Sequence, residues 1–154
     1  MKILLIQEKG RHLENYEYRE ALNLKRALDK KGIDCVVWGL NYENFSTPFD
    51  IISKDCDVII LIENYESGNW IPDLSKVNKL KLFWSVDSHC VPMQHIATVI
   101  KHNIDIVLHA VYGHEKYFKN KITHWFPNAY PSDLIYPMND VIKKYDVEIG
   151  RAHV

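Results

Sequence analysis

The stretch Val58-Ile59-Ile60-Leu61-Ile62 is a continuous run of β-branched and leucine side chains with no polar residue inside it. Such runs are typical of strands in parallel sheets, because both faces of a parallel sheet are covered by other elements. A similar run, Ile3-Leu4-Leu5-Ile6, stands near the start of the chain. The two runs predict buried strands of one parallel sheet.

The segments between such runs follow a helical period. In residues 16–31 apolar and charged side chains fall on opposite sides of a helix that we expect to end at Gly32. A second helix is expected to begin at Pro92. Its apolar residues repeat at i, i+3, i+4 and i+7: Met93, Ile96, Ala97 and Ile100.

The remaining elements continue the alternation of strand and helix. Strands are expected over 33–38, 80–86, 104–108 and 122–126, and short helices over 49–55 and 112–119. Strands separated by helices, with no hairpin turn between them, imply right-handed crossovers. We therefore expect an α/β fold, a Rossmann-like three-layer domain with a parallel sheet of about six strands.

Length and charge limit the function classes. A chain of 154 residues with a formal net charge of −1 forms one domain and carries no excess of basic residues to bind nucleic acid or hold an anionic bilayer. Because no run approaches about 18 apolar residues, no membrane span is expected. We expect a cytoplasmic protein, and peripheral membrane association stays open. The unpaired spacing of Cys35, Cys56 and Cys90 predicts small buried hydrophobes in a reducing compartment.

The familiar cofactor motifs are missing. A dinucleotide site needs G-x-G-x-x-G after the first strand, but residues 7–12 contain one glycine, Gly10. The Walker phosphate loop is absent as well. The eight histidines lack the spacing of an H-E-x-x-H zinc site. We therefore expect no cofactor and no metal.

Ligands of parallel α/β sheets bind at the carboxyl ends of the strands, so the residues that follow each strand are the candidates. These are residues 7–11, 39–41, 63–65, 87–89, 109–113 and 127–130. In an extended backbone Asp87 and His89 would both face the crevice, as a carboxylate that accepts a proton beside an imidazole that titrates near neutral pH. The alternative is that Asp87 caps the following turn and His89 is a surface histidine.

Charged and aromatic side chains are the other candidates at these loops. Lys9 and Arg11 could meet a phosphate or a partner domain, or simply lie in solvent. Three tryptophans lie in or beside predicted strands and are expected in the core: Trp38, Trp84 and Trp125. Trp70 and Tyr65 are expected to be free to touch a ligand.

Four features of the chain occur in an order known from one family. They are the opening Lys2-Ile3-Leu4-Leu5-Ile6, the segment Trp84-Ser85-Val86-Asp87-Ser88-His89, His109 at a strand end, and Trp125-Phe126-Pro127-Asn128-Ala129-Tyr130. This order resembles the N-terminal half of the GT-B glycosyltransferases, especially those like the spore maturation protein CgeB. A D-x-H after the fourth strand and an x-L-P-x-A/G after the sixth recur in that group. The resemblance covers nearly all of residues 1–150.

The resemblance implies a function and a set of site residues. In a GT-B enzyme the amino half holds the acceptor and the carboxyl half binds the nucleotide sugar. It implies Asp87 and His89 as catalytic residues, one of them the base for the acceptor hydroxyl, and Gly10 as the point of close approach to the donor phosphates. Further residues expected around the acceptor cleft are Arg11, Glu63, Asn64, Trp70, His109 and Asn128.

The resemblance also implies a division of the chain. Residues 1–150 would be the acceptor domain, residues 151–154 a tail of cloning origin, and the donor-binding domain would lie outside this chain. Transfer from a nucleotide sugar to a glycan or other hydroxyl acceptor would need no metal, and the chain alone would be inactive or nearly so. An apolar flank is expected where the donor half docks. The alternative is a free-standing Rossmann-like module that binds a small ligand or a protein without catalysis.

Overall fold

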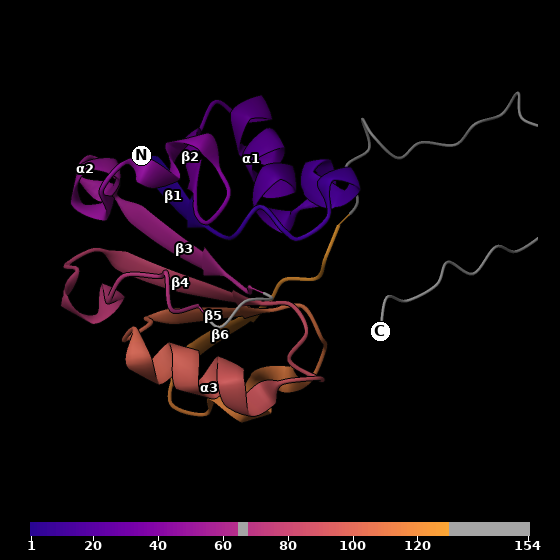
Figure 1. Ribbon diagram of the computed structural model, residues 1–154. Coiled ribbons are helices and arrows are strands. Elements are labelled where there is room, and N and C mark those ends of the chain that lie inside the picture. Colours follow the sequence, from indigo (N-terminus) through magenta and orange to yellow (C-terminus); the bar gives the residue numbers. More distant parts are fainter. Residues whose placement is uncertain (65–67, 130–154) are drawn as a thin grey trace, which may run out of the picture.

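The computed structural model describes residues 1–64 and 68–129 (Figure 1). Six parallel strands form one sheet in the order β2-β1-β3-β4-β5-β6. They are β1 (Lys2–Ile6), β2 (Asp34–Trp38), β3 (Val58–Ile62), β4 (Leu80–Ser85), β5 (Ile106–His109) and β6 (Ile122–Trp125). The boundary expected at residue 150, the tail 151–154, Tyr65 and Tyr130 lie outside the described residues.

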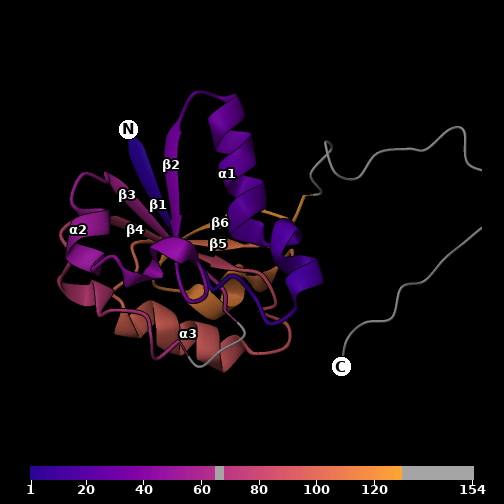
Figure 2. The ribbon, with the colours of Figure 1, turned by 45° about the horizontal axis from the view of Figure 1, so that its top comes forward.

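Helices lie on both sides of this sheet. The α-helices are α1 (Glu20–Lys30), α2 (Phe49–Ser53) and α3 (Pro92–Lys101), and short 3-10 helices are η1 (Leu13–Tyr18), η2 (Glu43–Ser46), η3 (Leu74–Lys76) and η4 (His114–Phe118). Figures 1 and 2 show α1 on one side of the sheet and α3 on the other. The predicted Rossmann-like three-layer α/β fold is confirmed.

The core consists of two clusters, one on each face of the sheet. Side chains alternate between the faces along every strand, so Leu4 and Leu61 pack in the cluster that contains Val99 of α3, whereas Leu5 and Ile62 pack in the cluster that contains Ala21 of α1. The four strand residues are almost fully buried. The continuous apolar runs of the sequence therefore serve both faces at once.

Two helices differ from their predicted form. The helix expected from residue 16 begins at Glu20, because Arg19 adopts an extended backbone and residues 13–18 form η1 instead. Near residue 112 the helix is a 3-10 helix, η4, preceded by Gly113 in the left-handed region at φ 79°. Each change occurs at a helix start, where side-chain periodicity says least about the backbone.

The buried face of α3 also differs from the predicted stripe. Met93 and Ile100 are 73% and 71% exposed, whereas His95 and Val99 are buried. The helix begins at Pro92 as predicted, but the apolar repeat at i, i+3, i+4 and i+7 does not mark the face that packs on the sheet. A histidine that finds hydrogen-bond partners replaces an apolar residue on the packed face.

Two further predictions of burial were wrong. Cys35 and Cys56 are buried as expected, but Cys90 is exposed in the turn after β4. Trp38 and Trp84 lie in the core, but Trp125 is 55% exposed because β6 is an edge strand of the sheet. An edge strand has a neighbour on one side only, so its side chains are less covered.

Candidate functional site

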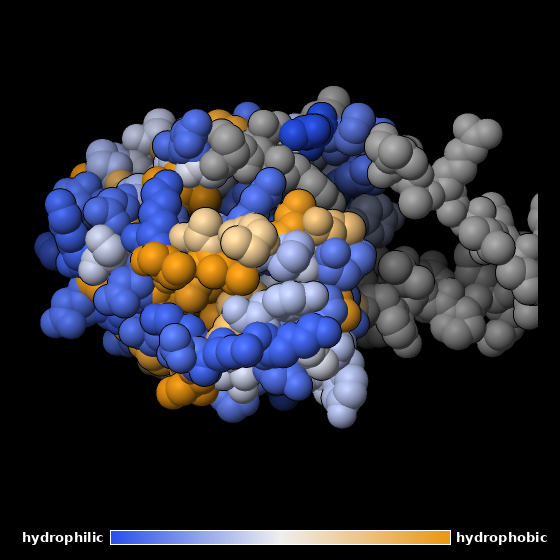
Figure 3. Space-filling view, turned by 90° about the horizontal axis from the view of Figure 1, so that it is seen from below, coloured by the Kyte–Doolittle hydropathy of each residue, from blue (hydrophilic) through white to orange (hydrophobic). Residues whose placement is uncertain are grey.

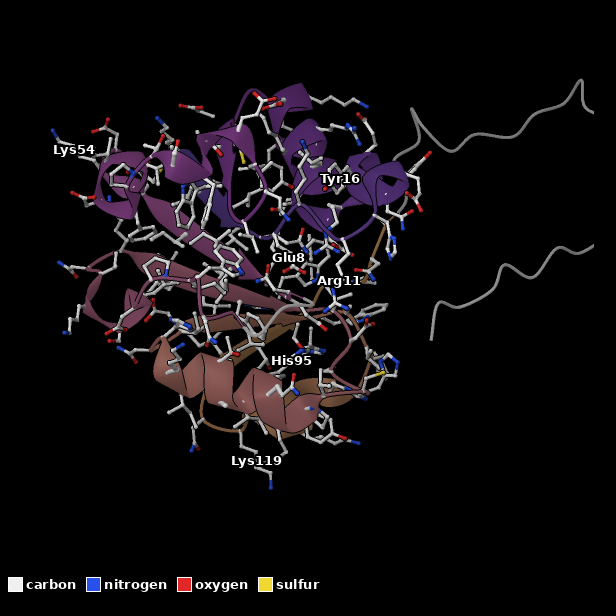
Figure 4. All side chains as sticks on the ribbon, viewed as in Figure 1. Glu8, Arg11, Tyr16, Lys54, His95 and Lys119 are labelled. Atoms are coloured by element: carbon white, nitrogen blue, oxygen red, sulfur yellow. The ribbon has the colours of Figure 1, made fainter. Side chains whose placement is uncertain are left out.

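The carboxyl ends of β1, β3 and β4 lie next to one another because these three strands are neighbours in the sheet. The residues that follow them therefore meet: Gln7 and Glu8 after β1, Glu63 and Asn64 after β3, and Asp87 after β4. Figure 4 shows Glu8 and His95 of α3 at this end of the sheet. Three separate stretches of sequence thus contribute to one polar site.

Glu63 is the most heavily hydrogen-bonded acid in this site. Its Oε2 accepts from the backbone nitrogens of Val86 at 2.8 Å and Asp87 at 2.6 Å, and lies 3.3 Å from Nε2 of His95. Burial alone would raise the pKa of Glu63, but the hydrogen bonds from His95 and from the Asp87 backbone outweigh it and lower the pKa. Glu63 is therefore an ionised carboxylate that fixes the start of the loop after β4.

His95 continues this network to Ser85. The Nδ1 atom of His95 lies 2.7 Å from Oγ of Ser85, and both side chains are buried. Because Nε2 faces the Glu63 carboxylate, it carries the ring proton and Nδ1 accepts from the serine hydroxyl. A serine, an imidazole and a carboxylate in a row suggest a hydrolase triad, but Ser85 is 0% exposed and out of reach of a substrate. The network instead joins β3, β4 and α3.

A second network, centred on Gln7, joins β1 to β3 and α1. Its Nε2 donates to Oε2 of Glu20 at 2.8 Å and to the backbone oxygen of Glu63 at 2.9 Å. Its Oε1 accepts from the backbone nitrogen of Ala21 at 2.9 Å. This bond satisfies an amide in the first turn of α1, so a residue distant in sequence does the work of a helix cap.

Asn64 is also bound to backbone. Its Oδ1 accepts from the nitrogen of Glu8 at 2.7 Å, and its Nδ2 donates to the oxygen of Ile62 at 2.7 Å. Both ends of the amide thus join the loops after β1 and β3. Asn64 can meet a ligand with its remaining acceptor and donor capacity only.

Asp87 differs from Glu63 in its surroundings. It is partly exposed and lines a small hollow together with Arg19, Glu20 and Glu63. Among the described residues no donor bonds to its carboxylate. Burial and the negative charge of Glu63 raise the pKa of Asp87, while His89 acts in the opposite direction.

The backbone after β4 is a turn and not the extended segment that the sequence predicted. The nitrogens of Cys90 and Val91 donate to the backbone oxygen of Asp87 at 2.9 and 3.4 Å. In this turn His89 is exposed, whereas the Oγ of Ser88 lies 2.7 Å from Nδ1 of His114. Asp87 and His89 are close enough to interact electrostatically, but through the turn and not through strand alternation.

The other predicted site residues lie in different surroundings. Gly10 is buried at φ 105°, where a Cβ would come within 3.4 Å of Cδ of Arg19. Arg11 is exposed at the same end of the sheet as Glu8 (Figure 4). Asn128 is exposed in the segment after β6.

Trp70 and His109 belong to the packed interior. The Trp70 ring is partly buried, with centroid distances of 6.0 Å to Trp38 and 5.8 Å to Phe45. His109 is buried at the end of β5, with Nδ1 3.0 Å from the oxygen of Val111 and Nε2 3.9 Å from Glu115. The structure therefore brings together Glu63, Asn64 and Asp87, whereas Trp70 and His109 make their contacts with other residues.

A larger hollow of about 480 Å³ lies on the α3 side of the same loops. Glu63 and Asn64 line it from the strand ends, and His95 and His102 line it from the side of α3. Burial lowers the pKa of His102 and keeps its ring neutral. Glu63 and Asn64 therefore stand between two hollows, one beside Asp87 and one beside α3.

Sequence reasoning missed Ser85 and His95 as members of the site, and it included Gln7 only within the candidate range 7–11. One signal was present for His95, because it precedes Val99 by four residues on the helix face that packs against the sheet. Gln7 directly follows a buried strand, but a lone glutamine carries no motif. Their role depends on partners that only the fold brings close.

An apolar flank is exposed beside this site, at the carboxyl ends of β5 and β6. Tyr112 is 81% exposed and packs edge-to-face on Trp125 at a centroid distance of 5.6 Å. Phe126 is 37% exposed and packs on Trp84. The exposed apolar side chains expected near the strand ends are therefore present.

The fold and the site define a Rossmann-like α/β domain with an acidic site at its strand ends. Comparisons with family models, with curated proteins and with solved structures find no match to this chain. Within residues 1–64 and 68–129 no three His, Cys, Asp or Glu side chains group as a metal site. In the same residues no helix has the length and apolar character to cross a membrane.

Proposed function

We propose that this domain is the acceptor-binding half of a metal-independent glycosyltransferase, which moves a sugar from a nucleotide sugar to a glycan or other hydroxyl acceptor. The observation that carries the proposal is the Asp87 carboxylate. It stands at the end of a central strand, is held by backbone contacts to Glu63, and has no donor among the described residues. The sequence resemblance to GT-B enzymes supports the same assignment.

Asp87 is the residue we propose as the general base. A base must accept the proton of the acceptor hydroxyl as the new glycosidic bond forms, and it acts best when its pKa approaches the working pH. The pKa of Asp87 is raised by burial and by Glu63, in the direction that this task needs. His89, exposed in the same turn, would bind the acceptor or assist Asp87 electrostatically.

The leaving nucleoside diphosphate would be stabilised elsewhere. That step requires donors or cations placed at the developing charge. We propose that a donor-binding domain outside this chain supplies them, and that the exposed flank of Tyr112 and Trp125 faces that domain. The chain alone would then bind acceptor without completing transfer.

The test is a binding screen of this chain by thermal shift and calorimetry, with glycans on one side and UDP-, GDP- and dTDP-sugars on the other. We expect a glycan to bind, and the nucleotide sugars to bind only when the domain is joined to a donor-binding half. Asp87→Ala should weaken glycan binding, whereas Asp57→Ala, an exposed acid that follows α2, should not.

Tight binding of a nucleotide sugar by the chain alone would contradict the proposal, and so would the absence of glycan binding.

One observation favours a second candidate function, a module that binds a small ligand without catalysis. The hollow of about 480 Å³ has the size of a small-molecule site and combines apolar walls with Glu63 and His102. Binding of a small ligand that Ala97→Trp blocks, with no glycan binding, would favour that candidate.

A further inference from the structure

A groove lies between α3 and η4, on the side of the sheet opposite α1. It has a volume of about 340 Å³. Its walls are the apolar side chains of Ile96, Ile100 and Tyr117, and its lining includes Lys116, Lys119 and Lys121. We call it the lysine groove. Figure 3 shows this face of the molecule, where apolar residues gather among hydrophilic ones.

The apolar wall of the lysine groove is only partly used in packing of the domain, because Ile96 and Tyr117 pack against the core while remaining partly exposed. Residues Val99 and Phe118 beneath it are buried in the core, whereas Ile100 is 71% exposed. Helix α3 therefore carries apolar side chains beyond the face that it packs on the sheet. An apolar surface of this kind, surrounded by polar residues, is typical of a protein-interaction site.

The charged part of the lysine groove is strongly one-sided. Residues 116–121 read Lys-Tyr-Phe-Lys-Asn-Lys, with three lysines and no acid, in a chain whose formal net charge is −1. None of the three forms an ion pair with another described residue. Lys116 instead lies 5.3 Å from the centre of the Tyr117 ring. The positive charge of this surface is therefore available to a partner.

We propose that the lysine groove binds a peptide segment of a partner protein in which apolar side chains are flanked by aspartates or glutamates. The apolar side chains would fill the hollow lined by Ile96, Ile100 and Tyr117, and the acids would pair with Lys119 and Lys121. A concave site favours such a peptide over a flat lipid surface, because a bilayer is best met by apolar side chains that protrude. This site is separate from the strand ends and does not depend on the proposed catalysis.

The test is a titration of this chain into a fluorescein-labelled synthetic peptide that places leucines and a phenylalanine among glutamates. We expect saturable binding that weakens as salt is added. The combined variant Lys119→Glu/Lys121→Glu should weaken binding at least about tenfold. Ile100→Glu should weaken it as much, because it places a negative charge on the apolar wall of the groove. Ile100 and Lys119 are exposed and Lys121 is partly exposed, so circular dichroism and thermal midpoints should stay unchanged.

Two controls separate this site from general attraction between charges. Lys54→Glu reverses one lysine charge at an exposed position after α2, far from the groove (Figure 4), and should leave the affinity unchanged. A peptide with lysines in place of the glutamates should not bind. An equal loss from Lys54→Glu, or equal binding of the lysine peptide, would overturn the proposal. Binding to phosphatidylserine vesicles without binding of the acidic peptide would overturn it as well and would identify a lipid surface as the partner.

Discussion

Glu63 and Asp87 are two acids at the ends of adjacent strands, but their hydrogen bonding and their pKa shifts are opposite. Glu63 receives hydrogen bonds from two backbone nitrogens and lies against His95, and its pKa is lowered. Asp87, on the next strand, has no donor among the described residues, and its pKa is raised. The supply of donors, rather than burial, separates the two acids, because both are partly desolvated.

This difference indicates a division of labour. A carboxylate whose lone pairs are occupied holds structure, whereas one without donors has lone pairs left for a substrate. Glu63 is the side chain that positions the backbone of Asp87. The candidate site therefore consists of one partly exposed acid, Asp87, on a rigid support, the arrangement that precise placement of a reacting group requires.

The largest expected effect tests Asp87 in catalysis. In a protein that joins this domain to a donor-binding half, Asp87→Asn should lower the rate of glycosyl transfer by about 100-fold or more, since loss of a general base costs this much. Stability should change by less than about 1 kcal/mol. Measurement of kcat together with urea unfolding checks both. A transfer rate within a few-fold of the wild type would remove Asp87 as the base.

The second prediction concerns Glu63, the side chain that holds the backbone of Asp87. Glu63→Ala leaves two backbone nitrogens and His95 without their acceptor, and should lower the free energy of unfolding by about 3 kcal/mol. Urea unfolding measures it. Asp57→Ala is the matched control, because its Oδ2 also accepts from a backbone nitrogen, that of Lys2, but at the exposed end of the sheet. Equal losses in the free energy of unfolding from Glu63→Ala and Asp57→Ala would show that the Glu63 network stabilises the domain no more than an exposed hydrogen bond does.

The third prediction concerns His95. His95→Phe keeps a ring of similar size but removes the contacts to Ser85 and Glu63, and should cost about 1–2 kcal/mol. His89→Phe, in the exposed turn, serves as control and should leave the unfolding midpoint in place. If His95→Phe were neutral, the buried imidazole would be a packing residue only.

The smallest effect is a difference in pH dependence. The folded pKa of Glu63 lies below its ordinary 4.5, so its contribution to stability is present above 4.5 and is lost as the pH falls through the folded value. The folded pKa of Asp87 lies above its ordinary 3.8, so its favourable contribution is present below 3.8 and is lost as the pH rises through the folded value.

Stability measured from acid to neutral pH tests these signs. The advantage of the wild type over Glu63→Gln should grow as the pH rises toward 4.5. The free energy of unfolding of the wild type relative to Asp87→Asn should fall as the pH rises from 3.8. Parallel curves for the two variants would contradict the contrast between the acids.

Much of the fold follows from patterns that lie within short segments. The runs at residues 3–6 and 58–62 indicate strands covered on both faces, and all six strands form close to the expected residues. Because parallel strands end at one edge, the placement of Glu63, Asn64 and Asp87 at the same edge of the sheet follows as well. The form of η4, the exposure of Trp125 and the turn at His89 do not, since each depends on what lies beside it in space.

The sequence by itself determined the class of fold and the acids at its strand ends, because hydropathy with a period of two or 3.6 residues is a local property. Only the tertiary structure decided that the Glu63 carboxylate receives hydrogen bonds and that the Asp87 carboxylate receives none from the described residues. The donors to Glu63 lie 23 and 24 positions away in the sequence, and the partner of Ser85 is His95 of helix α3. Hydrogen bonds between distant segments form only when the strand order brings them within reach, and no spacing in the chain encodes that order directly.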